Sequence, residues 1–280
     1  MKKTVPKQVD NAFLHTLLSS LETWAEGALI LDWKNVEELL PETHCAILHL
    51  RDLLEEGGLE LRHESQKGVQ AFGGFSDIFN LNLSEKPIQR AGVYISPVKE
   101  EGRITKDFEA LKKFLKPHLP SPFDYTAISS PFSELYSNIC QHAEAQKGYI
   151  FVTQPDKEGN ITFFFSDPGV GIVKNIRDFF RDKKDEPDEV LIEYATQDRV
   201  STKSQIQNQG RGLANVLSSI ESMGGRVEIC SGKGRLVSEA NKKPLNSLPY
   251  DHKGTLIALR FNINRVEELD HDEYSTDIDF

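Results

Sequence analysis

Apolar residues recur every three or four positions in two stretches of the second half of the chain, a spacing typical of amphipathic helices. The first stretch follows Ser130, for which we predict the role of N-cap, with Pro131 at the first helical position. The second begins at Leu213 and stops before Gly224 and Gly225, which we expect to form its C-cap. The two stripes consist of Phe132, Leu135, Tyr136, Ile139 and Ala143, and of Leu213, Val216, Leu217, Ile220 and Met223.

Short apolar runs with the composition of strands lie between and after these helices. Residues 149–154 and 161–167 form two such runs, and residues 226–232 and 254–261 form two more. The stretch 173–209 is polar and of mixed charge, and we expect a long loop there. Helices and strands in this order predict the α/β class.

The first part of the chain shows a smaller version of the same alternation. The predicted elements are a helix over 11–24, a strand over 29–33, a helix that begins after Pro41 and stops at Gly57, and a strand over 59–65. Strand, helix and strand in succession favour an α/β sandwich. A link with several prolines follows between 98 and 122, so we place a domain boundary at residue 97.

Composition narrows the classes of protein to consider. The 280 residues are 38% hydrophobic and 27% charged, which suits one large globular domain or two. No apolar run reaches the ~18–20 residues of a membrane span, and the first residues lack the apolar core of a signal peptide. Cys45, Cys140 and Cys230 are few and far apart, which argues against a disulfide framework or a zinc cluster. We therefore expect a cytoplasmic protein.

The balance of charge argues against nucleic acid as a partner. The net charge is −10, with 33 basic and 43 acidic residues, whereas binding to duplex phosphates requires clustered basic side chains. Seven acidic residues follow Arg265, so we interpret residues 265–280 as an acidic, solvated tail.

Two glycine-rich segments have the chemistry to hold a nucleotide. Asp167 opens a D-x-G-x-G segment, and its carboxylate can accept a hydrogen bond from the exocyclic amine of adenine, where guanine presents a carbonyl. Gly169 and Gly171 lack side chains, so the backbone can approach the base. Gly210 and Gly212 do the same for phosphates, which the N–H groups of a helix N-terminus attract.

A row of polar side chains accompanies the first helix, because Glu134, Asn138 and His142 are spaced by four residues. Asn138 offers a neutral oxygen of the kind that Mg²⁺ prefers, and Glu134 is placed to deprotonate a nucleophile near a γ-phosphate. Lys203 is the leading candidate for a positive charge at that phosphate, and Arg211 is the second. A solvated helix face or loop stays open as the alternative interpretation of these residues.

The order of these motifs resembles the GHKL superfamily of ATP-binding domains, which includes gyrase, heat-shock chaperone ATPases, MutL, histidine kinases and anti-sigma-factor kinases. The N-box of that family corresponds to residues 134–142, its first glycine box to 167–171 and its second to 210–213, which ends at Leu213. Thr255 matches the threonine that assists adenine binding in the family.

This resemblance implies a Bergerat-type α/β sandwich over residues 98–264, with a mixed sheet and helices on one face. The loop between Ile172 and Gln209 would be the ATP lid.

Residues 1–97 resemble, more loosely, a STAS domain of the anti-sigma-antagonist type. The resemblance lies in LILDWKNV, the helix after Pro41, LELRHES and the aromatic stretch around GGFSDIF. Such antagonists carry a phosphoacceptor serine at the start of that helix, where this chain has only Thr43 nearby, so we expect an interaction domain. Chains that join both parts resemble bacterial signalling or defence-associated ATP-binding proteins.

The resemblance leaves three functions open. The first is a Mg²⁺-dependent ATPase in which Glu134 is the base and ATP controls a regulatory switch on a protein partner. The second is a serine/threonine protein kinase that phosphorylates a separate STAS-domain protein. The third is a scaffold with a vestigial nucleotide site. We expect ATP and Mg²⁺ as cofactors and a protein as partner, expect neither a membrane nor nucleic acid, and leave a homodimer open.

Overall fold

The computed structural model describes most of the second half of the chain and separate pieces of the first. The described residues are 2–4, 8–9, 13–14, 17, 28–32, 38–39, 43–56, 60–64, 88–90, 93–98, 100–142, 148–198, 200, 212–240 and 242–266.

A six-stranded sheet forms the centre of the molecule, with its strands in the order β10-β11-β9-β8-β7-β6. Its strands are β6 (Ile88–Arg90), β7 (Val93–Val98), β8 (Gly148–Thr153), β9 (Asn160–Asp167), β10 (Arg226–Glu239) and β11 (Leu245–Asn262). Every pairing described within it is antiparallel, so the expected mixed sheet is wrong. Antiparallel neighbours need only a short connection, and β10 and β11 extend beyond the predicted runs because they pair as one long hairpin.

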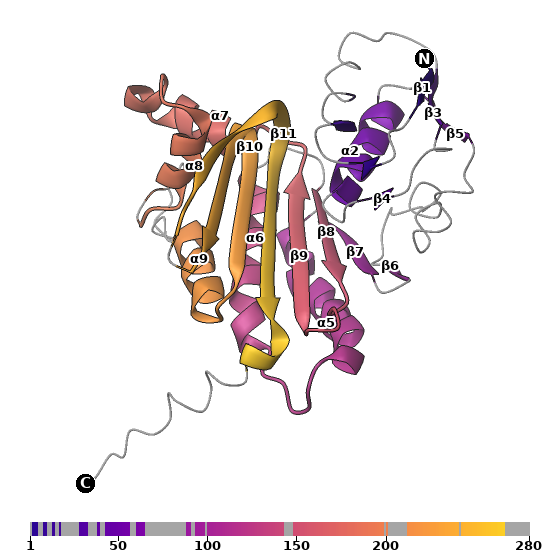
Figure 1. Cartoon of the computed structure of the whole chain (residues 1–280), viewed down its shortest axis with the longest axis vertical. Helices are drawn as coiled ribbons and strands as arrows, with labels where there is room; N and C mark the ends of the chain where they lie inside the picture. The colour runs from indigo at the N-terminus through magenta and orange to yellow at the C-terminus, as the bar shows by residue number, and fades with distance from the viewer. Residues whose placement is uncertain are drawn as a thin grey trace.

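Three of the described helices pack on one face of this sheet, behind it in Figure 1. They are α5 (Ile104–Leu115), α6 (Thr126–His142) and α9 (Gly212–Ser222). Phe132 of α6 meets Phe165 of β9 edge-to-face with ring centroids 5.8 Å apart, an arrangement that aromatic rings favour. Tyr136 is fully buried, and its hydroxyl donates to the Asp107 carboxylate of α5 at 2.8 Å. This bond fixes α6, which carries the predicted N-box, against α5.

The N-terminus of α6 lies one turn earlier than predicted. Asp124, two residues before the helix begins, accepts hydrogen bonds from the backbone N–H of Thr126 at 2.8 Å and from its hydroxyl at 2.6 Å, and so satisfies the first free N–H group of the helix. Pro131 therefore lies inside the helix, and the prediction of Ser130 as N-cap is wrong. The C-cap of α9 is confirmed, since Gly224 has φ +61° and the Gly225 N–H donates to the Ile220 carbonyl at 2.8 Å.

The polar stretch predicted as a loop contains two packed helices, α7 (Gly171–Phe179) and α8 (Asp188–Ala195), with the short 3-10 helix η3 (Arg181–Lys183) between them. Leu191 and Ile192 of α8 are completely buried. Asp188 attaches the start of α8 to β10, because its carboxylate accepts the Lys233 N–H at 2.6 Å. The same carboxylate pairs with Arg177 of α7 at 2.6 Å. The first part of the expected lid is thus part of the folded core, and residues 201–211 lie outside the described residues.

The described N-terminal elements match the predicted strand, helix and strand. β1 (Lys2–Thr4), β3 (Ala28–Asp32) and β5 (Glu60–Glu64) form a parallel sheet, and β2 (Gln8–Val9) pairs with β4 (Glu38–Leu39). The helix after Pro41 is α2 (Thr43–Glu56), which ends before Gly57 as predicted. Of the helix predicted over 11–24, Phe13, Leu14 and Leu17 are helical. The aromatic stretch around GGFSDIF lies outside the described residues.

α2 packs on the face of the sheet opposite α6. Successive strand residues point to opposite faces, so Ser166 faces away from the side on which Phe165 contacts α6. The His49 Nε2 of α2 lies 2.9 Å from the Ser166 hydroxyl oxygen, and the Tyr149 hydroxyl of β8 donates to the Asp52 carboxylate of α2. Helices therefore cover both faces of the sheet at β8 and β9, where the sequence predicts helices on one face.

The main sheet contains residues on both sides of the boundary predicted at residue 97, because β7 crosses that position and pairs with β8. At the other end, Val266 is buried in the core, and residues 267–280 lie outside the described residues. The division into 1–97, 98–264 and 265–280 stays a prediction.

Candidate functional site

Asp167 and Thr255 meet at one end of the main sheet. Asp167 is the last residue of β9, and Thr255 lies directly opposite it in β11. The Thr255 hydroxyl hydrogen-bonds the Asp167 carboxylate, which also accepts the Gly169 N–H at 2.9 Å. Both side chains are buried, with exposed fractions of 5% and 8%. The structure thus brings together three of the residues that the sequence assigns to a base-binding site.

Burial raises the pKa of the Asp167 carboxyl to about 6, while the hydrogen bonds from Gly169 and Thr255 act in the opposite direction. Removing a carboxylate from water disfavours its charged form. At neutral pH the group is still mainly ionised, so a hydrogen-bond acceptor with a full negative charge is held in a buried position. Such a group favours a ligand that donates a hydrogen bond to it.

The glycines near Asp167 are required by the protein's own packing. Gly171 has φ +78°, and a Cβ there would lie 2.5 Å from the Ser231 hydroxyl oxygen. Gly254 has φ +73°, and a Cβ there would lie 1.9 Å from the Asp167 carbonyl oxygen. The sequence predicts that Gly171 lets the backbone approach a base. In the structure, contacts within the protein already require glycine at this position.

Ser231 is a residue of this region that the sequence interpretation missed. It is 1% exposed, and its hydroxyl donates to the Gly254 carbonyl at 2.9 Å. Its position in an apolar strand, just before Gly232, is the only local signal of a special role.

Glu134 lies against the N-terminus of α9, where the second glycine box enters its helix. A Cβ added to Gly212 would lie 2.0 Å from the Glu134 carboxylate oxygen Oε1, so a larger residue would displace this carboxylate. Asn138 follows Glu134 one turn later on α6, and both are half-buried. Leu213 packs against the core of the domain.

The N-box row leads towards Asp167. A Cβ added to Gly148, the first residue of β8, would lie 2.6 Å from Ile139 of α6 and 3.5 Å from the Cβ of Asp167. Ile139 is the neighbour of Asn138 in the sequence, so Asn138 lies on α6 between Glu134 and the level of Asp167. The helix rises ~1.5 Å per residue, so Glu134 and Ile139 are separated by about 7.5 Å along the axis of α6.

Several predicted residues cannot be placed in this geometry. Lys203, Gly210 and Arg211 lie outside the described residues, and nothing is described of the His142 side chain. Among the described residues, no group of three or more His, Cys, Asp and Glu side chains is arranged to hold a metal. The three cysteines are free thiols.

None of the helices in the described part of the chain has the length and apolar character needed to cross a membrane.

Comparison with known proteins identifies a family for the segment of the chain that contains this site. Residues 124–263, half of the chain, match the model of the histidine kinase-, DNA gyrase B- and HSP90-like ATPases. The crystal structure of the B-subunit of the DNA gyrase from Myxococcus xanthus aligns with 38% of this chain at 13% identity, with a TM-score of 0.21. The aligned part is 29% of that gyrase chain. No curated protein matches the sequence. The family match does not include residues 1–97, whose likeness to a STAS domain stays a prediction.

Proposed function

The chain belongs to the family of histidine kinase-, DNA gyrase B- and HSP90-like ATPases, and from this premise we propose that it binds ATP at Asp167 and hydrolyses it with Glu134 as general base. The buried Asp167–Thr255 pair inside the matched segment is the observation that carries this proposal. Hydrolysis is favoured because the Glu134 carboxylate adjoins the start of α9.

The described residues fit ATP at two points. The ionised Asp167 carboxylate accepts a hydrogen bond from the exocyclic amine of adenine, while the Thr255 hydroxyl and the Gly169 N–H keep that carboxylate in place. The N-terminus of α9 offers N–H groups and a partial positive charge to the phosphates, and the absence of a side chain at Gly212 lets the Glu134 carboxylate lie beside this helix start. Lys203, Gly210 and Arg211 are proposed to complete the phosphate site.

Mg²⁺ fits the same site through the amide oxygen of Asn138, which is half-buried beside the Glu134 row. When bound, the ion would offset the negative charge of the phosphates. Glu134 would take a proton from the attacking water. The water oxygen then forms a bond to the γ-phosphorus, and the bond between that phosphorus and the bridging oxygen of ADP breaks.

The contacts of α2 support a regulatory use of the nucleotide. His49 contacts Ser166, the residue before Asp167 in β9, so α2 touches the strand that presents the adenine-binding carboxylate. We infer that α2 and its neighbours transmit the nucleotide state to a protein partner. The homodimer and the separate STAS-domain partner are both proposals for what that partner is.

Substitution of Glu134 by alanine tests the catalytic part of the proposal. We expect ATP turnover by the full chain with Mg²⁺ to fall by about tenfold or more, while the Kd of ATP from calorimetry stays within about twofold of the original. Glu109→Ala, which removes an exposed carboxylate of α5, is the matched control and should leave both values unchanged. Unchanged turnover in Glu134→Ala would disprove the role of Glu134 as base.

The fate of a labelled γ-phosphate separates the three functions. Release of free phosphate supports the ATPase, and transfer to an added STAS-domain protein supports the kinase. If calorimetry with Mg²⁺ detects no binding of ATP to the full chain, the scaffold with a vestigial site replaces both.

A further inference from the structure

Ser231 connects three chain segments around the Asp167–Thr255 pair. It lies in β10, and its hydroxyl donates to the Gly254 carbonyl of β11 at 2.9 Å. The same oxygen accepts the N–H of Val173, in the first turn of α7, at 3.4 Å. One buried hydroxyl therefore contacts both the strand that carries Thr255 and the helix that follows the first glycine box.

The regular pairing of β10 with β11 is interrupted at this serine. Cys230 pairs with Leu256, whereas Gly232 pairs with His252, so β11 has two extra residues between these positions. A bulge of this kind disrupts the ladder of backbone hydrogen bonds and bends the strand. The Ser231 hydroxyl supplies a cross-strand hydrogen bond where the ladder is interrupted.

The bulge lies next to the residues of β11 that contact Asp167. Gly254 has φ +73° and lies so close to β9 that a Cβ would fall 1.9 Å from the Asp167 carbonyl oxygen. Thr255 follows it in the sequence and hydrogen-bonds the Asp167 carboxylate. The orientation of the Thr255 hydroxyl consequently depends on how the Gly254 peptide is held.

We propose that Ser231 is a positioning residue for nucleotide binding, which acts by fixing the Gly254 carbonyl and so holding the Thr255 hydroxyl on Asp167. The inference rests on the proposed function, in which Asp167 binds the adenine base. Ser231 itself touches neither base nor phosphate in this role.

The test compares nucleotide affinity in Ser231→Ala, Thr255→Val and the double variant, measured by calorimetry with ADP on the full chain. Loss of the Ser231 hydroxyl should raise the Kd of ADP by about tenfold, because it leaves the buried Gly254 carbonyl without this donor. If Ser231 acts through Thr255, adding Ser231→Ala to Thr255→Val should change the Kd by less than about twofold. A merely structural serine would give additive effects instead.

Ser238→Ala is the matched control for loss of a buried serine in the same strand. Ser238 is fully buried in β10, but its hydroxyl donates to Glu221 of α9, away from Gly254. Its removal should lower the melting temperature without altering the Kd of ADP. Ser231→Cys keeps a weak donor of similar shape, and we expect it to restore part of the affinity lost in Ser231→Ala. This variant also provides the measurement if Ser231→Ala does not fold.

Each outcome has a distinct meaning. If the unmodified chain binds ADP and Ser231→Ala binds it equally well, the role of Ser231 is refuted and the proposed function stands. Additive effects in the double variant, or a Ser231→Cys variant no better than alanine, refute it in the same way. If the unmodified chain binds neither ADP nor ATP, the proposed function fails and this inference fails with it.

Discussion

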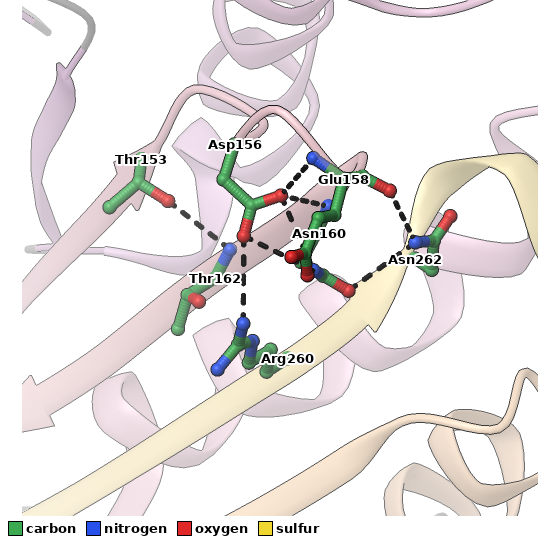
Figure 2. Close-up of polar contacts among 7 residues, drawn as sticks. All are labelled: Thr153, Asp156, Glu158, Asn160, Thr162, Arg260 and Asn262. Carbon is green, nitrogen blue, oxygen red and sulfur yellow. Dashed lines mark hydrogen bonds and ion pairs between the residues drawn. The ribbon is translucent and has the colours of Figure 1, made fainter.

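Two aspartates at opposite ends of β9 differ in almost every physical property. Asp156 lies in the turn before the strand, where Figure 2 shows its carboxylate surrounded by donors. It accepts the N–H groups of Glu158 and Asn160 at 2.9 Å each, and the Asn160 side chain and Arg260 also contact it. These hydrogen bonds, chiefly those from Asn160, lower the pKa of Asp156, which is exposed to water.

Asp167 lies at the other end of the strand, buried and with a raised pKa. From the described residues its carboxylate receives hydrogen bonds from Gly169 and Thr255. A carboxylate offers about four acceptor positions, so acceptor capacity remains for a ligand.

The comparison distinguishes an aspartate that stabilises a turn from the one that we propose to bind the base. Asp156 is stabilised in its charged form by the turn that it closes, so the protein gains from its ionisation. Asp167 is destabilised in its charged form by burial, so the fold carries a cost that a hydrogen-bond donor from a ligand can offset. The two residues are of the same type, and their surroundings decide the difference.

Among the substitutions at these two positions, Asp167→Asn should have the largest effect on nucleotide binding. The amide removes the negative charge without changing the shape of the side chain. We expect the Kd of ATP to rise by about a hundredfold, since a buried hydrogen bond to a charged acceptor is lost. Calorimetry on the full chain measures this value, and Asp156→Asn is the control that should keep the original Kd. Unaltered ATP affinity in Asp167→Asn would show that adenine is not bound by this carboxylate.

The same substitution should make the nucleotide-free protein more stable at neutral pH. A rise in pKa from 3.8 to about 6 corresponds to a cost of about 1–3 kcal/mol for the ionised group, which asparagine avoids. Because the folded state binds this proton more tightly, the cost is full above pH 6, shrinks as the pH falls through 6 and vanishes below the ordinary value of 3.8. Urea unfolding at pH 8, 6 and 4 measures the free energy of unfolding of both proteins. A stability difference that does not shrink between pH 8 and pH 4 contradicts the assignment.

Asp156→Asn should have the smallest effect and the opposite sign. Its folded pKa is lowered, so the stabilisation is present above the ordinary pKa and is lost as the pH falls through the lowered value. We expect the melting temperature at pH 7 to drop by about 1–3 °C, as for the loss of exposed turn contacts, and the ATPase rate to stay the same. Differential scanning calorimetry checks the first expectation. A large loss of ATPase activity would mean that this end of β9 also serves the site.

The extent to which the sequence predicts the fold depends on how local each signal is. The C-cap of α9 was predictable because glycine at φ +61° is a local requirement. The start of α6 was misplaced because two local signals compete, and the hydrogen bonds from Thr126 to Asp124 prevail over the Ser130-Pro131 pair. Helices α7 and α8 were missed because they are only nine and eight residues long and are separated by charged residues, although Leu191 and Ile192 of α8 are completely buried.

The sequence by itself determined the chemical character of the site. D-x-G-x-G, the N-box pair Glu134 and Asn138, and Thr255 are residue types whose donors, acceptors and lack of side chains suit a nucleotide wherever they lie. Only the tertiary structure decided that Thr255 of β11 lies opposite Asp167 of the neighbouring strand β9 and that Gly212 adjoins Glu134. The same holds for the hydrogen bond from Ser231 to Gly254 at the bulge. The physical reason is that strand register and close packing depend on residues far apart in the chain, which local patterns of polarity do not encode.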